Sequence, residues 1–87
     1  MYYIIVYDVN ERRIRKVHTI LKKYLYWRQR SVFEGELSNS QFRQLMRKLN
    51  ELINETEDSV IIYEVQYKGL VKVHYLGDSQ QEDDFVI

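Results

Sequence analysis

Asp8 is the residue whose type and position most strongly suggest chemistry. It comes near the end of the run 2–9, which otherwise consists of tyrosine, isoleucine and valine. A carboxylate among apolar strand residues is costly unless it is solvated, hydrogen-bonded or bound to a metal ion. Asp8 is therefore a candidate catalytic and metal-binding residue. The plain alternative is that it only caps the helix that follows.

Mg²⁺, or another divalent cation, is the cofactor that this carboxylate could hold. The ion keeps several waters and usually takes one or two carboxylates together with substrate phosphates. One Asp8 would hold it poorly, whereas a two-fold axis near Asp8 would bring in the same residue from a second copy of the chain. We therefore expect a homodimer in which two Asp8 carboxylates share one ion. That ion would polarise a phosphoryl oxygen and acidify the attacking water.

Basic residues gather next to Asp8 along the sequence. Four fall in the first turns of the helix expected after Asn10, and two alternate along the next extended segment, which would place them on one face. A helix N-terminus and arginine side chains both suit phosphate groups. The candidate nucleic-acid-binding residues are Arg12, Arg13, Arg15, Lys16, Arg28 and Arg30. For each one alone, a solvated basic face is the simpler interpretation.

The charge of the chain is balanced in total and uneven along its length. The 87 residues carry 13 Lys and Arg against 13 Asp and Glu, with a net charge of zero. Residues 1–48 hold eleven of the basic residues and four of the acidic ones, so a basic half precedes an acidic half. A basic half attracts phosphates and an acidic half repels them. Charge therefore gives weak support to nucleic-acid binding.

Several classes of site and location are excluded or disfavoured. The chain contains no cysteine, which rules out disulfides and thiolate metal sites. The sequence shows neither a long apolar run nor a signal peptide, so we expect a cytoplasmic protein that makes no membrane contact. His18 falls on an apolar helix stripe and is expected to be packed rather than catalytic. Glu34, Glu36 and Asp58 are expected to be solvated acids at strand ends and turns.

The first half of the chain reads as a strand, a helix and a broken strand. Residues 2–9 are apolar on both alternating faces, which predicts a strand buried on both sides. Asn10 is a suitable N-cap. Residues 27–37 are extended, with a kink or bulge whose position the sequence does not fix. The expected core stripe of the first helix is Ile14, Val17, His18, Leu21, Tyr24 and Leu25.

The second half reads as a helix and two strands. Ser38 and Gln41 form a capping box at the start of the second helix. Strands are expected at 60–67 and 70–76, joined by a short hairpin at Lys68 and Gly69. The apolar stripe of the second helix is Phe42, Leu45, Met46, Leu49, Leu52 and Ile53.

This order of elements predicts an α+β fold. The expected arrangement is a ferredoxin-like βαββαβ sandwich with two helices on one face of an antiparallel sheet. Residues 1–76 would form this domain, and residues 77–87 a polar, acidic C-terminal tail that ends in three apolar residues.

Three short motifs carry a resemblance to a known family. They are YDV at 7–9, SVFEG at 31–35 and DSVIIY at 58–63. With this spacing, residues 1–76 resemble the CRISPR-associated endoribonuclease family, the second CRISPR-associated protein (Cas-two) of the spacer-acquisition module. The resemblance implies a ferredoxin-like dimer packed sheet against sheet, with a tail that adds a strand to the partner's sheet.

The same resemblance implies an activity and a set of site residues. Asp8 matches the family's metal-binding aspartate, and Tyr7 and Phe33 match two further catalytic-site positions. Members of the family are described as magnesium-dependent endonucleases on single-stranded RNA or double-stranded DNA. They also bridge two dimers of the CRISPR integrase (Cas-one) in spacer acquisition for antiviral defence.

Three functional hypotheses follow. The first is the metal-dependent phosphodiesterase with Asp8 as the metal ligand. The second is a non-catalytic DNA-binding scaffold within the integrase complex, in which the arginines matter and Asp8 does not. The third is a sheet-face RNA binder or small-ligand regulatory domain. It is disfavoured because the strand at 60–67 lacks the aromatic pattern of RNA-recognition motifs.

Overall fold

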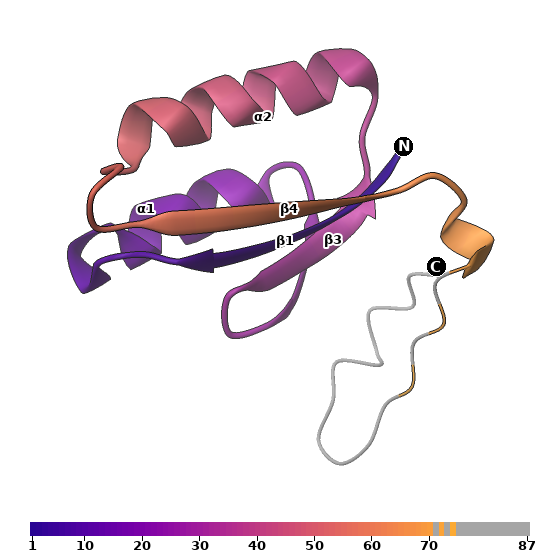
Figure 1. The fold of residues 1–87 in the computed structure, drawn as a ribbon, viewed down its shortest axis with the longest axis horizontal. Coiled ribbons are helices and arrows are strands. Elements are labelled where there is room, and N and C mark those ends of the chain that lie inside the picture. The colour runs from indigo at the N-terminus through magenta and orange to yellow at the C-terminus, as the bar shows by residue number, and fades with distance from the viewer. Residues whose placement is uncertain (71, 73, 75–87) are drawn as a thin grey trace.

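The structure, a computed structural model, describes residues 1–70, 72 and 74. Within these residues, strands and helices follow one another as predicted (Figure 1). The elements are β1 (Tyr2–Asp8), α1 (Glu11–Lys22), β2 (Tyr26–Gln29), β3 (Val32–Glu36), α2 (Asn39–Leu52), β4 (Ser59–Val65) and a short 3-10 helix, η1 (Lys68–Leu70).

The four strands form one antiparallel sheet in the order β2-β3-β1-β4. The central strand β1 pairs with β3 on one side, and along its whole length with β4 on the other. The two helices contact each other and lie over one face of the sheet (Figure 1). The predicted α+β, ferredoxin-like arrangement is confirmed.

Both helices begin where the sequence predicts a cap. The Asn10 side chain accepts a hydrogen bond from the backbone N–H of Arg12 at 3.0 Å. Ser38 Oγ accepts from the N–H of Gln41, whose own side chain accepts from the N–H of Ser38, so the capping box is confirmed. Such caps satisfy N–H groups that the helix itself leaves open. They fix the start of α1 just beyond the strand that carries Asp8.

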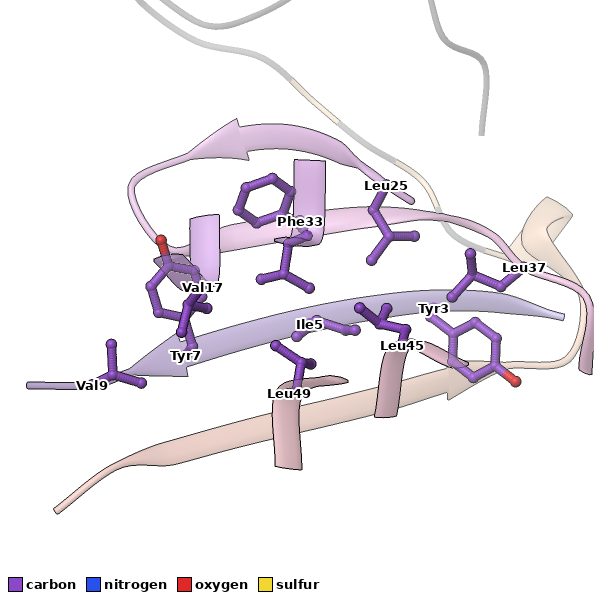
Figure 2. Packing of buried hydrophobic residues seen from close by; sticks show 11 residues of the cluster. Tyr3, Ile5, Tyr7, Val9, Val17, Leu25, Phe33, Leu37, Leu45 and Leu49 are labelled. Carbon is purple, nitrogen blue, oxygen red and sulfur yellow. The ribbon is translucent and has the colours of Figure 1, made fainter. Parts of the chain in front are cut away.

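The main core lies between the sheet and the helices (Figure 2). Tyr3, Ile5 and Tyr7 point from β1 into this layer, and the Tyr3 ring stacks on Phe42 of α2 with centroids 4.5 Å apart. Full burial of one such apolar side chain contributes about 1.5–3 kcal/mol. The other members of the cluster are Val9, Val17, Leu21, Leu25, Phe33, Leu37, Leu45 and Leu49.

The opposite face of the sheet is also apolar, and it is less covered. Tyr2 is buried there, whereas Ile4 and Val6 are only half-buried. Their direct partners on β4 are Tyr63 and Ile61, which are 52% and 48% exposed. We call Ile4, Val6, Ile61 and Tyr63 the open face. The prediction that β1 is buried on both sides is therefore met at Tyr2 and only in part at the next two positions.

The extended segment 27–37 is a hairpin made of β2 and β3. The strands are joined by a tight turn at Arg30 and Ser31, in which Arg30 has a positive φ of 45°. The register shifts between Trp27 and Gln29, so a bulge falls at Arg28. Bulges break the alternation of side chains. The expected shared face of Arg28 and Arg30 is therefore wrong: Arg28 is buried, whereas Arg30 is exposed in the turn.

The chain after β4 differs from the prediction where the structure describes it. The strand expected at 60–67 ends at Val65, and Lys68 and Gly69 belong to the 3-10 helix η1 instead of a hairpin turn. The N–H of Leu70 donates to the carbonyl oxygen of Tyr67, which closes this turn. Most of the strand expected at 70–76, and the whole of the tail 77–87 with its predicted pairing to a partner, lie outside the described residues.

Candidate functional site

Asp8 is the last residue of β1, and its side chain is exposed. It pairs across the sheet with Ser59, the first residue of β4. A cavity of about 330 Å³ opens beside it. The residues that line the cavity are Tyr7, Asp8, Val9, Ile14, Arg30 and Ser31. The turn between β2 and β3 thus brings Arg30 to the cavity that Asp8 also lines.

Tyr7 and Phe33 lie in the core behind Asp8 (Figure 2). Phe33 is fully buried, Tyr7 is 4% exposed, and their rings stack with centroids 6.3 Å apart. Burial raises the pKa of Tyr7 above its ordinary value of 10.0, so the phenol stays neutral at physiological pH. The backbone N–H of Tyr7 donates to the carbonyl oxygen of Ser31 at 3.1 Å. The predicted catalytic role of both rings remains a prediction.

Aromatic contacts hold the turn that carries Arg30. His18 of α1 meets the rings of Trp27 and Phe33 edge-on, each with centroids 5.1 Å apart, so the expected packing role of His18 is confirmed. The indole N–H of Trp27 donates to the carbonyl oxygen of Arg30 at 2.9 Å. These contacts fix the backbone of the turn whose residues Arg30 and Ser31 line the cavity beside Asp8.

Asp58 joins the loop after α2 to the start of α1. Its side chain has no solvent exposure and accepts hydrogen bonds from the backbone N–H groups of Asn10 and Asn54, both at 2.8 Å. It also accepts from Arg13 Nε at 2.6 Å and Nη2 at 3.1 Å. These bonds, first of all those from Arg13, hold the pKa of Asp58 well below its ordinary value of 3.8. The expectation that Asp58 is solvated is wrong.

Two of the predicted phosphate-binding arginines are largely buried in ion pairs with carboxylates. Arg13 is 16% exposed and also reaches Glu57 at 2.8 Å. Arg28 and Glu34 form a buried ion pair at 2.5 Å, with side chains 8% and 7% exposed. The expectation that Glu34 is solvated is wrong, because a buried carboxylate needs such a partner. Their predicted role in binding nucleic acid remains a prediction.

The other predicted cations are exposed. Arg15 and Lys16 lie on the outer face of α1, and Arg30 lies in the turn beside Asp8. Arg12 has a side chain 71% exposed, 3.8 Å from Glu57. Arg12 thus shares Glu57 with Arg13, whereas Arg15, Lys16 and Arg30 form no ion pair with a described residue and are available to a phosphate backbone.

Ile14 and Ser31 line the cavity, although neither was a candidate site residue. Ile14 was expected in the buried stripe of α1 and is 44% exposed instead, so that prediction is wrong. Ile14 lies on the first turn of α1, where the apolar side of the helix faces the cavity instead of the sheet. Apolar periodicity alone does not reveal where a helix passes the edge of the sheet beneath it.

Among the described residues, Asp8 is the one carboxylate that lines the cavity. In the described part of the chain, no three His, Cys, Asp or Glu side chains gather closely enough to hold a metal ion. Asp8 is exposed at a strand end beside an open cavity, which suits a hydrated Mg²⁺ that takes one or two carboxylates. The donor set therefore fits a magnesium ion shared with a second Asp8 better than an ion held by one chain.

Neither α1 nor α2 is long and apolar enough to cross a lipid bilayer, and the same holds for η1 in the described residues.

Comparison with known proteins agrees with this fold. The model for the family "CRISPR associated protein Cas2" matches residues 1–73. A CRISPR-associated endoribonuclease Cas2 from Thermotoga maritima is 44% identical over 86 residues, which cover 99% of both chains. One from Dictyoglomus turgidum is 56% identical over 63 residues, 72% of each chain. A crystal structure of Cas2 superposes with a TM-score of 0.85 at 45% identity, covering 100% of this chain and 98% of the other.

Proposed function

Because the chain belongs to the Cas2 family of CRISPR-associated proteins, we propose that it is a metal-dependent endonuclease of antiviral defence. It cleaves phosphodiester bonds in single-stranded RNA or double-stranded DNA. The two relatives described above are named endoribonucleases. The observation that carries the proposal is the exposed carboxylate of Asp8 at a cavity that Arg30 also lines.

Each residue of the site has a distinct task in this proposal. Asp8 would hold Mg²⁺, and a bound divalent cation offsets the negative charge that develops on the phosphoryl oxygens. Arg30, at the same cavity, binds the phosphate next to the bond that is cut. Tyr7 and Phe33 act from the core as positioning residues, because their stacked rings support the strand end that presents Asp8.

A homodimer completes the site. Each chain contributes one Asp8, and the open face offers apolar surface next to the strand that carries it. Burying the open face against a second copy would remove Ile61 and Tyr63 from water and bring the central strands of the two sheets together. Such a dimer can place two Asp8 carboxylates about one axis.

The experiment that tests this function compares Asp8→Asn with Glu11→Gln, which removes the same charge from an exposed residue nearby. Asp8→Asn should lower magnesium-dependent cleavage of single-stranded RNA and duplex DNA at least a hundredfold. Glu11→Gln should stay within about twofold of the parent protein. Equal cleavage by rigorously purified Asp8→Asn and parent protein would refute the hydrolytic proposal.

A second candidate function is a DNA-binding scaffold that bridges dimers of the CRISPR integrase, Cas-one. Two features of the described residues favour it: Asp8 is the one carboxylate that lines the cavity, and several cations of α1 are exposed. In this case, cells with the Arg15→Gln variant would not acquire spacers, whereas cells with the Asp8→Asn variant would still acquire them. Loss of acquisition in Asp8→Asn alone would exclude a purely scaffolding role.

A further inference from the structure

A second set of cations lies outside the site at Asp8. Lys22 ends α1 and Lys23 is its C-cap, and three more cations extend from the outer face of α2. All five side chains are exposed, and none forms an ion pair with a described residue. We call this set the Tyr24 cluster, because Tyr24 joins its two halves. Its members are Lys22, Lys23, Arg43, Arg47 and Lys48.

Tyr24 fixes the end of α1 to the middle of α2. Its hydroxyl donates to Gln44 Oε1 at 3.5 Å, and Lys48 Nζ lies 5.2 Å from the centroid of its ring. Lys22 and Lys23 directly precede Tyr24, and Arg43 directly precedes Gln44. The two contacts therefore bring cations from both helices to one region of the helical layer.

An ordinary solvated helix face does not account for this cluster. Such faces usually mix acids and bases one turn apart, which stabilises the helix, whereas like charges one turn apart destabilise it. Arg43 and Arg47 are such a like-charged pair. The acids of the two helices are Glu11, at the far end of α1, and Glu51, which lies one turn after Arg47 but makes no ion pair with it, so five cations of the cluster face one nearby acid. Uncompensated positive charge of this kind favours an anionic ligand.

The spacing between the cluster and Asp8 indicates what kind of anion fits. Asp8 lies beside the start of α1 and the Tyr24 cluster lies at its end, and α1 has 12 residues. At about 1.5 Å per residue, the helix spans roughly 18 Å. A duplex advances about 3.4 Å per base pair, so roughly five base pairs separate the two places. A continuous phosphate backbone can occupy both, and a single small anion cannot.

We propose that the Tyr24 cluster is a second phosphate-contact site for the same polynucleotide that reaches Asp8. The polynucleotide runs along α1 and crosses onto α2, so the cluster determines how tightly long substrates bind. This inference rests on the proposed function only in assuming that the protein binds nucleic acid. It does not depend on whether Asp8 cleaves.

The test uses the full chain and two matched double variants. Lys23→Gln with Arg47→Gln removes two charges from the cluster. Gln66→Glu with Lys72→Gln changes the net charge equally at exposed positions outside the helical layer. The probes are a labelled 20-base-pair duplex and a 20-nucleotide single-stranded RNA, with binding measured over a range of salt concentrations. Thermal unfolding of each variant checks that it is folded.

The cluster variant should bind the duplex about tenfold more weakly near 0.1 M salt. Its slope of log K against log salt should be shallower by about 1.8, since each lost phosphate contact removes about 0.9. The slope for RNA should fall by about 1.4. The control should keep the parent slopes.

If the slopes of log K against log salt were unchanged in the cluster variant, the proposal would be overturned. These cations would then bind an acidic protein surface instead of nucleic acid. An equal loss in the control would also overturn it, because net charge alone would then explain the effect. If Asp8→Asn cleaves normally but the cluster variant shows the shallower slopes, the nuclease proposal fails and this inference stands.

Discussion

At the scale of single residues, ion pairs with carboxylates decide which cations near Asp8 remain available to a ligand. Arg13 is held by Asp58 and Glu57, and Arg28 by Glu34. The sequence predicts that these arginines lie near Asp8. It contains no pattern that distinguishes the arginines held in ion pairs from Arg15, which is exposed. The reason is distance along the chain: Asp58 is 45 residues from Arg13, so the pair exists only after folding.

Asp58→Asn tests the role of this carboxylate. An amide cannot form the ion pair with Arg13, so the melting temperature should fall by on the order of 10 °C at neutral pH. Because folding lowers the pKa of Asp58, its contribution is present above the ordinary carboxyl pKa of 3.8 and is lost as pH falls below it. The difference in melting temperature should therefore be full above about pH 5 and should shrink in stronger acid.

Thermal unfolding of both proteins from pH 7 to pH 3 measures this difference. A constant difference across the range would show that Asp58 stabilises the fold by packing alone. Glu55→Gln, at an exposed carboxylate in the same loop as Asp58, serves as the control and should change the melting temperature little.

At the scale of the elements, the parts with local signals were predictable from the sequence. The capping box at Ser38 and Gln41 and the N-cap at Asn10 are complete within a few residues, and both are confirmed. The turn between β2 and β3 was not predictable. Its residue with positive φ is an arginine, where glycine or asparagine is the usual signal. Contacts from Trp27 hold the turn in place of that local preference.

Arg30→Gly separates the backbone of this turn from its charge. A left-handed backbone costs an L-residue about 1–2 kcal/mol, and glycine relieves this cost while losing more entropy on folding. The free energy of unfolding should therefore stay unchanged or rise by about 1 kcal/mol. Duplex binding should weaken, with a salt slope shallower by about 0.9, because one phosphate contact is lost.

Arg30→Ala is the matched variant, since it loses the charge and keeps the strain. Urea unfolding should give a higher free energy of unfolding for Arg30→Gly than for Arg30→Ala. The two variants should bind DNA with the same reduced affinity. If the glycine variant were the less stable of the two, the positive φ would not be a source of strain.

At the scale of the whole molecule, the sheet has one face under the helices and one open face. The sequence predicted a first strand buried on both sides, because residues 2–9 are apolar on both alternating faces, and the single chain buries the second face only at Tyr2. The exposure of Ile61 and Tyr63 shows where the uncovered apolar surface continues on β4. The open face and the single Asp8 of the described chain are the features on which the proposed dimer depends.

Tyr63→Glu should convert the dimer to a monomer. A carboxylate on the open face would lose water without gaining a partner when two sheets meet. Size-exclusion chromatography with light scattering measures the mass, and cleavage should fall together with the dimer. Thr19→Glu, which adds the same charge on the exposed side of α1, should leave the dimer intact. A dimeric Tyr63→Glu protein would place the interface elsewhere.

Counting bound metal tests most directly whether two Asp8 carboxylates form one site. Mn²⁺ can stand in for Mg²⁺, and electron paramagnetic resonance distinguishes its bound and free forms in a titration of the dimer. The account predicts one tightly bound Mn²⁺ per two chains, lost in Asp8→Asn and retained in Glu11→Gln. One bound ion per chain, or an undiminished count in Asp8→Asn, would contradict it.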